Sequence, residues 1–491
     1  MATKSLILNL TIDNSKNKVL FAESDKDFVD VLLSFLTTPL GTLVSLSNKN
    51  SLLCLDNLYK SVEDLGDEYF KTTPCREMLL RPNHAAEIDC LDLPLNVHGD
   101  RPLIYYTCSQ NCAHELLSLY ANALCACGSK MMRKVKVVRG SSKKEPGEGV
   151  FLKCATRFLI TDNFTVIPAS TQAAFNLLGC AGTSLSSVVE KQVSVGLSEI
   201  IAILRQSLIA EDTFTNVFLE GENANELEKK NSPFALVSHP KPCSDPTDNF
   251  VGIKLIVDKH KNKVLYAECN QDFIDILFSF LTYPSGFVIK SLNGKSHLTC
   301  LDNLFATVLS KPMADCFKTE ETKEYLVNPR LYSHFRSTKS LVKSDEAVPA
   351  RYYMCRTPDC VSTEVSLVPN VQCKCARINN KKSITNKRMK ITDPRTSRAS
   401  GLSDQGYVSV ATYIVTDDLV VTPFSVSTLT RMIANASEGV VEIPVNIGEK
   451  EVLALLEAAL GSQAVFTDSF LIKEETTTNA ICGDDSDCVI V

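Results

Sequence analysis

Two groups of four cysteines have the spacing of metal ligands. The first is Cys108, Cys112, Cys125 and Cys127, and the second is Cys355, Cys360, Cys373 and Cys375. In each group a spacer of 12 residues separates two short cysteine pairs, so the chain can turn back and bring four thiolates around one ion. Four sulfur ligands leave no coordination position open for water, which is typical of structural zinc. We therefore predict two structural zinc sites, each in a zinc-ribbon-like pair of knuckles.

Other interpretations of the cysteines remain open. Cysteine packs well as a small hydrophobe, so buried free thiols are the first alternative. Disulfides are the second, and the lack of a secretory signal disfavours them. His114 could replace one ligand of the first group, although a surface histidine is the simpler interpretation. Cys54 and Cys300 lie at equivalent helix starts, and we interpret them as core residues rather than nucleophiles.

Each cysteine group is followed by a stretch rich in lysine and arginine. The candidate phosphate contacts are Lys134, Lys136, Arg139, Lys381, Lys382, Lys387 and Arg388. A zinc ribbon beside basic residues is a recurrent nucleic-acid surface, because such residues displace counterions from phosphates. Both stretches lack aromatic residues for base stacking, and the net charge of −6 provides no general basic field. Solvated loops are the competing interpretation.

No recognised catalytic motif is present. The chain lacks a P-loop, a Gly-x-Gly-x-x-Gly turn, a Gly-x-Ser-x-Gly elbow and a His-Glu-x-x-His pair, so no small-molecule substrate is indicated. Asp162 and Asp417-Asp418 could form a carboxylate site, but Asp favours turns, and we interpret both as turns beside strands. The terminal Cys488-Val-Ile-Val fits a prenylation motif, which the acidic residues before it disfavour at an anionic membrane.

The chain repeats itself with a shift of about 245 residues. Residues 17–41 and 262–286 are identical at 16 of 25 positions, and Cys54-Leu-Asp-Asn-Leu recurs at Cys300. The matches keep their order through both cysteine groups, so the chain is a tandem duplication. We predict a first lobe over 1–219, a polar linker over 220–249, a second lobe over 250–473 and a flexible acidic tail over 474–491.

The elements that would position the cysteines mix strands and helices. Alternating apolar residues predict strands, and apolar residues at helical spacing predict helices. In the first copy we expect strands over 6–12 and 19–22, helices over 28–36 and 56–65, a β-rich stretch through 105–106 and 151–161, and a closing helix over 197–209 matched by 451–460. Without a strict βαβ rhythm, the pattern favours the α+β class, with a mixed sheet and packed helices in each of two homologous lobes.

Composition excludes several classes of protein. A length of 491 residues exceeds an ordinary domain of about 100–200 residues. Hydrophobic residues at 44% and charged residues at 22% are close to the globular average, which excludes disorder throughout and fibres. No window has 18 uncharged apolar residues, so we expect no membrane span. Nineteen cysteines without a secretory signal predict a reducing compartment, the cytoplasm or the nucleus.

The repeated motifs resemble a known family. They are Asn17-Lys-Val-Leu-Phe-Ala-Glu with Asp27-Phe-Val-Asp, Cys54-Leu-Asp-Asn-Leu-Tyr, Cys125-Ala-Cys-Gly, and Thr416-Asp-Asp-Leu-Val-Val-Thr-Pro. They are similar to the plant family called domain of unknown function 674, over nearly the whole chain and in both copies. The resemblance implies a plant protein and no activity. The chain departs from the family at Ala376, where a glycine would ease the turn of the second knuckle.

By elimination, we predict a non-catalytic intracellular scaffold that binds or regulates a protein partner and contains two structural zinc ions. The first alternative is a nucleic-acid-binding protein that uses the basic residues beside the zinc ribbons. The second is an enzyme whose motif is not recognised. Nothing in the sequence names a ligand.

Overall fold

The structure is a computed structural model. It describes residues 5–47, 52–97, 103–110, 112, 114–138, 149–153, 157–182, 184–220, 250–332, 335, 341–342, 351–355, 363–373, 375, 384–396, 406–433 and 439–471. The predicted linker, apart from Glu220, and the predicted acidic tail lie outside these ranges, as do Arg139, Cys360, Lys381, Lys382 and Cys488. Among the described residues, no helix combines the length and the apolar character needed to cross a membrane.

Each copy forms one five-stranded antiparallel sheet. The strands of the first sheet are β1 (Leu6–Asp13), β2 (Lys18–Ser24), β6 (Phe158–Thr161), β7 (Val166–Pro168) and β8 (Val188–Val195), in the order β7-β6-β2-β1-β8. Those of the second are β9 (Val251–Asp258), β10 (Lys263–Asn270), β15 (Thr412–Thr416), β16 (Val421–Pro423) and β17 (Val440–Ile447), in the order β16-β15-β10-β9-β17. The two orders match strand for strand, as a duplication requires.

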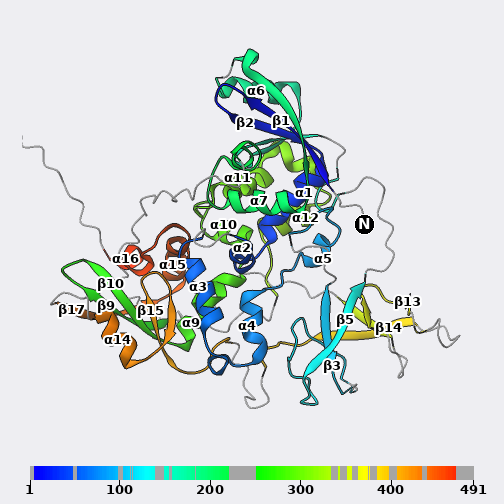
Figure 1. Cartoon of the computed structure of the whole chain (residues 1–491). Coiled ribbons are helices and arrows are strands. Elements are labelled where there is room, and N and C mark those ends of the chain that lie inside the picture. Colours follow the sequence, from blue (N-terminus) through cyan, green and yellow to red (C-terminus); the bar gives the residue numbers. More distant parts are fainter. Residues whose placement is uncertain are drawn as a thin grey trace, which may run out of the picture.

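Most of the helices lie in the space between the sheets (Figure 1). Those of the first copy are α1 (Lys26–Ser34), α2 (Leu40–Leu46), α3 (Cys54–Asp64), α4 (Thr73–Leu80), α5 (Glu87–Cys90), α6 (Thr171–Cys180), α7 (Leu197–Ser207) and α8 (Thr213–Thr215). Those of the second are α9 (Gln271–Ser279), α10 (Ser285–Ser291), α11 (Thr299–Leu309), α12 (Glu320–Val327), α14 (Val426–Ile433), α15 (Glu449–Gly461) and α16 (Val465–Phe470). Short 3-10 segments are η1 (Phe35–Thr37), η2 (Asp67–Tyr69), η3 (Leu185–Ser187), η5 (Phe280–Thr282) and η6 (Lys311–Cys316), and η4 (Asn216–Glu220) is a π-helix.

Local sequence explains how each copy begins. The turn from β1 to β2 contains Asn17 with a φ of 48°, and Asn262 repeats this conformation with a φ of 46° in the second copy; asparagine tolerates the left-handed region better than most residues. Asp25 then caps α1 by accepting hydrogen bonds from the N–H groups of Asp27 and Phe28. Asn270 caps α9 in the same way.

The two copies meet at their second helices. Pro39 and Pro284, which precede α2 and α10, face each other in an antiparallel bridge. Gly41 lies against the carbonyl oxygens of Leu281 and Leu79, where an added Cβ would be 2.9 Å from both. Gly286 repeats this close approach in the other copy. The absence of a side chain at these glycines therefore lets the copies pack tightly.

The copies also exchange helices. Helix α3 of the first copy packs on the second sheet, where Asn57 donates to the Asp418 carbonyl at 2.9 Å and Cys54 donates to the Ser462 carbonyl at 3.1 Å (Figure 1). Helix α11 of the second copy packs on the first copy. There Asn303 donates to the Asn163 carbonyl at 2.9 Å, and Cys300 donates to the Ala210 carbonyl at 3.2 Å. Each sheet is thus completed by a helix from the other half of the chain.

The third sheet contains strands of both copies. These are β3 (Ile104–Cys108), β4 (Leu116–Leu117), β5 (Met131–Val138), β11 (Tyr352–Cys355), β12 (Glu364–Ser366), β13 (Val371–Gln372) and β14 (Ile384–Ile391). Strand β12 pairs in parallel with β5 of the other copy, and β4 pairs in parallel with β14. A bridge between Tyr106 and Ser118 joins β3 to the segment after β4. The pairings therefore close into a ring in the order β14-β11-β12-β5-β3-β4, which we call the ring sheet.

Tyr105 and Tyr352 occupy equivalent positions in the ring sheet and meet each other. Their rings are edge-to-face with centroids 5.4 Å apart, and their hydroxyl oxygens are 3.2 Å apart. Both side chains are at most 1% exposed. They belong to one continuous cluster of buried apolar residues that runs through both copies.

The structure confirms a mixture of helices and sheets of the α+β type. The mixed sheet was predicted within each lobe. Among the described strands, parallel pairing joins strands of different copies in the ring sheet, and both five-stranded sheets are antiparallel. The predicted boundaries of the two lobes and of the linker remain predictions. What periodicity did not indicate is that helices and strands cross between the copies.

Candidate metal centres

The first cysteine group lies at one end of the ring sheet. Cys108 is the last residue of β3, after a bulge in its pairing with β5. Cys125 and Cys127 lie in the tight turn before β5, where the Gly128 N–H donates to the Cys125 carbonyl at 2.7 Å. Gly128 has a φ of 87°, a conformation that favours glycine. Cys112 approaches from the connection between β3 and β4.

The four sulfur atoms of this group converge. The Sγ atoms of Cys108 and Cys127 are 3.4 Å apart, and those of Cys112 and Cys125 are also 3.4 Å apart. All four lie within 4.8 Å of one another. Zinc–sulfur bonds of about 2.3 Å in a tetrahedron place the sulfurs about 3.8 Å from each other. The residues present therefore fit a four-coordinate ion with small adjustments.

The knuckle has only a small apolar core among the described residues, beside its backbone hydrogen bonds. Cys108, Ala123, Cys125 and Met131 form a small buried cluster that is separate from the main core. A cluster of this size buries too little apolar surface to stabilise a folded loop alone, and structural metals commonly supply the missing free energy.

The thiols differ in their readiness to ionise. Hydrogen bonds from the backbone and side chain of Ser129, and then from Cys108, lower the pKa of Cys127 to about 6. Burial tends to raise the pKa of Cys112, but hydrogen bonds with His114 and neighbouring thiols outweigh it and lower the pKa. Burial raises the pKa of Cys125 to about 12. Cys127 can thus supply a thiolate near neutral pH, which is the form that binds metal.

His114 lies beside the cluster. Its Nδ1 is 3.4 Å from the Cys112 Sγ, and the residue is exposed. With four sulfurs already converging, this position suits a hydrogen-bond partner of a ligand better than a fifth ligand.

Three of the four cysteines of the second group also converge. Cys355 ends β11, as Cys108 ends β3, and Cys373 and Cys375 follow β13. The Sγ atoms of Cys355 and Cys375 are 3.6 Å apart, and all three sulfurs lie within 4.8 Å of one another. Cys360 lies outside the described residues. The second group thus repeats the arrangement of the first in the residues that are described.

The basic residues lie on two separate strands. Lys134 and Lys136 are exposed on β5, whereas on β14 Arg388 is exposed and Lys387 is half-buried. In the ring sheet, β5 and β14 are separated by β12 and β11 on one side and by β3 and β4 on the other. The four predicted basic residues that the structure describes therefore lie on two separate strands and not on one continuous surface.

The aspartates that we predicted to be in turns do lie in turns, and they also bind the short helices α8 and α16. Asp162 accepts from the N–H groups of Phe214 and Thr215 at 2.5 and 3.1 Å, and Asp417 accepts from the N–H and hydroxyl of Thr467 at 2.9 and 2.6 Å. Burial raises the pKa of Asp162 to about 6, against these hydrogen bonds. Their role in the structure is to position the chain.

Sequence reasoning missed a second pair of buried aspartates. Asp30, on the apolar face of α1, accepts from the N–H groups of Val150, Phe151 and Leu152 at 2.5 to 3.1 Å. Asp275, its equivalent in α9, accepts from the N–H groups of residues 407 and 408 at 2.7 and 3.0 Å. The available signal was an acidic residue retained in both copies of an otherwise apolar helix face.

Cys54 and Cys300 are core residues, as predicted. They are at most 1% exposed, and burial raises the pKa of Cys300 to about 12. A buried thiol with a raised pKa is a poor nucleophile. Their hydrogen bonds to carbonyls of the other copy make them part of the helix exchange.

Comparison with known proteins gives one match. The family described as "Protein of unknown function (DUF674)" matches residues 2–313 and 307–488. No curated protein and no solved structure matches the chain.

Proposed function

The chain belongs to the DUF674 family of proteins of unknown function, and we propose that it is a non-catalytic scaffold that binds or regulates a protein partner and contains two structural zinc ions. The observation that supports this proposal is the convergence of four sulfur atoms within 4.8 Å at the end of the ring sheet. Four protein thiolates fill a tetrahedral ion, so no position is left for a substrate or a reactive water.

The position of the clusters suggests what the metal would stabilise. In the first cluster it would tie the end of β3 to the turn before β5 through Cys108, Cys125 and Cys127. Strand β5 pairs in parallel with β12 of the other copy. A zinc ion here would therefore stabilise the contact between the two halves of the chain, in a reducing compartment where thiols remain free to bind it.

Metal analysis of the purified full chain tests the zinc sites. We expect about two zinc ions per chain, and about one after Cys108→Ser with Cys112→Ser. The matched control is Cys180→Ser, because Cys180 is exposed and lies outside both clusters. Absence of zinc, with the cluster thiols reacting freely in the native protein, would contradict the proposal.

Affinity purification tests the scaffold role. We expect a protein partner that is recovered with the full chain and with Cys180→Ser, and that is lost with Cys108→Ser and Cys112→Ser. A partner that binds all variants equally would show that partner binding does not depend on the first metal site.

Nucleic-acid binding is the second candidate, supported by the exposed basic residues on the ring sheet. Two double variants test this candidate, one on each strand: Lys134→Gln with Lys136→Gln on β5, and Lys387→Gln with Arg388→Gln on β14. Because β5 and β14 lie apart, each double variant should weaken nucleic-acid binding independently of the other and should reduce the salt dependence of the affinity. Binding that is unaffected by both pairs and by salt would exclude this candidate.

A further inference from the structure

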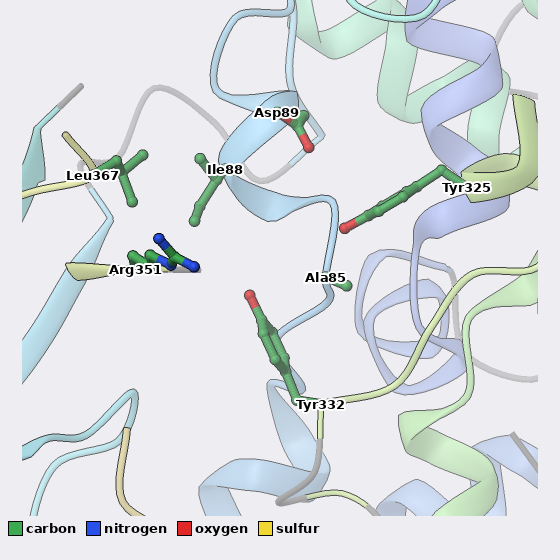
Figure 2. Close-up of a pocket in the computed structure, with 7 residues that line it drawn as sticks. All are labelled: Ala85, Ile88, Asp89, Tyr325, Tyr332, Arg351 and Leu367. Atoms are coloured by element: carbon green, nitrogen blue, oxygen red, sulfur yellow. The ribbon is translucent and has the colours of Figure 1, made fainter. Parts of the chain in front are cut away.

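A cavity of about 230 Å³ lies between the two copies. The first copy lines it with Ala85, Ile88 and Asp89, in and just before α5. The second copy lines it with Tyr325 on α12, Tyr332, Arg351 and Leu367 (Figure 2). The cavity is separate from both cysteine clusters, and none of the predicted site residues lines it.

Several hydrogen-bond donors face this cavity. Figure 2 shows the Arg351 guanidinium and the hydroxyl groups of Tyr325 and Tyr332 directed toward its interior. Within the described part of the chain, neither Arg351 nor the Tyr325 hydroxyl has a hydrogen-bond or ion-pair partner. Burial raises the pKa of Tyr325, so its hydroxyl remains protonated and able to donate. The Tyr332 hydroxyl already donates to the Tyr352 hydroxyl.

The cavity also limits what can enter. A water molecule occupies about 30 Å³ in the liquid, so the volume of about 230 Å³ suits a small organic molecule. Ala85, Ile88, Leu367 and the tyrosine rings provide apolar walls. Asp89 adds a negative charge that acts on Tyr325 and opposes a ligand with two negative charges.

The repeat shows that these donors belong to one copy. With the shift of 247 that relates Tyr105 to Tyr352, Tyr325 corresponds to Met78 and Arg351 corresponds to Ile104. Neither equivalent can bind an anion. The duplication alone therefore does not account for a cationic group and a phenol at this junction.

We propose that this cavity binds a small monocarboxylate with an apolar body. The Arg351 guanidinium would bind the carboxylate, because both groups are planar and can form two parallel hydrogen bonds with each other. The Tyr325 hydroxyl completes the donor set, and the apolar walls contact the body of the ligand. This site is independent of the proposed metal centres.

Calorimetric titration of the full chain with benzoate tests the proposal. We expect saturable binding of benzoate, and at least tenfold weaker binding of benzamide, which has the same shape without the charge. Inorganic phosphate should bind more weakly than benzoate because of Asp89. Tighter phosphate binding, equal benzamide binding or no benzoate binding at millimolar concentrations would each overturn the proposal.

Two variants locate the site. Arg351→Gln should weaken benzoate binding at least tenfold, and Tyr325→Phe should weaken it several-fold while preserving the ring. Arg351 is exposed, so its substitution should leave the fold intact. The matched control is Arg157→Gln, another surface arginine, which pairs only with Glu23 at 2.8 Å in the described structure and should bind as the wild type does. Benzoate binding that survives Arg351→Gln unchanged would refute the assignment.

Discussion

The close approach at Gly41 makes a quantitative prediction about the contact between the copies. A Cβ at this position would lie 2.9 Å from the carbonyl oxygens of Leu281 and Leu79, and 3.3 Å from the Leu281 Cβ. The first two neighbours are backbone atoms, so a side-chain rotation cannot remove the clash. Helix α2 would have to shift relative to its neighbours in both copies. Overpacking of this kind costs about 1–3 kcal/mol, and the better helix propensity of alanine returns less than about 1 kcal/mol. We expect Gly41→Ala to lower the free energy of unfolding by about 1–2 kcal/mol.

The chain offers a matched control for this substitution. Gly179 lies in α6, and a Cβ there would meet nothing within 4 Å. Gly179→Ala should therefore be neutral or stabilising by up to about 1 kcal/mol. Gly286→Ala should repeat the effect of Gly41→Ala, because its Cβ would meet two carbonyl oxygens at 2.8 and 2.9 Å.

Urea unfolding followed by circular dichroism measures these differences, which suits a chain with 0 Trp. The midpoint should fall for Gly41→Ala and Gly286→Ala at an unchanged slope. If Gly41→Ala were as stable as the wild type while Gly179→Ala behaved as expected, the proposed tight packing of the two copies would be wrong.

Three further predictions follow from other features. Burial raises the pKa of Asp30 to about 7 against three backbone hydrogen bonds, so its contribution to stability is lost as the pH rises from about 4 to about 7. Asp30→Asn should then lower the free energy of unfolding by about 1–3 kcal/mol at pH 5 and by less at pH 8; an equal effect at both would contradict this. In mass-spectrometric mapping of alkylation, Cys180 should react at once and the cluster cysteines only after a zinc chelator is added, and a chelator without effect would argue against bound metal. A fragment of residues 1–240 loses the sheet on which α3 packs, so we expect it to bind hydrophobic dyes and unfold without cooperativity; a cooperative monomer would show that the first lobe folds alone.

The elements near the start and the end of each copy could be predicted from local patterns. The strand expected over 6–12 is β1, and the helices expected over 56–65, 197–209 and 451–460 are α3, α7 and α15. Each has a buried apolar face at regular spacing, which is the feature that periodicity detects. Helix α6 was missed, because none of its residues is buried and no apolar stripe faces the core.

The exchange between copies could not be predicted from local patterns. Periodicity shows that α3 has an apolar face, but not which sheet covers it. The partner depends on tertiary contacts such as Asn57 with the Asp418 carbonyl, 361 positions away. The cavity beside Arg351 could not be predicted for the same reason, since its lining residues come from separate segments of both copies. The cysteine groups were found because their ligands are close in sequence, and the structure brings together all of the predicted ligands that it describes.

The contacts of Tyr105 with Tyr352 and of Pro39 with Pro284 have the form of an isologous interface, in which a surface meets its own equivalent. Two separate chains of one copy each could make these contacts only as a dimer, whose population depends on protein concentration. Joining the copies in one chain replaces that dependence with an effective concentration on the order of millimolar. The fold, in which the two copies exchange helices, should therefore remain assembled even when the protein is expressed at a low level.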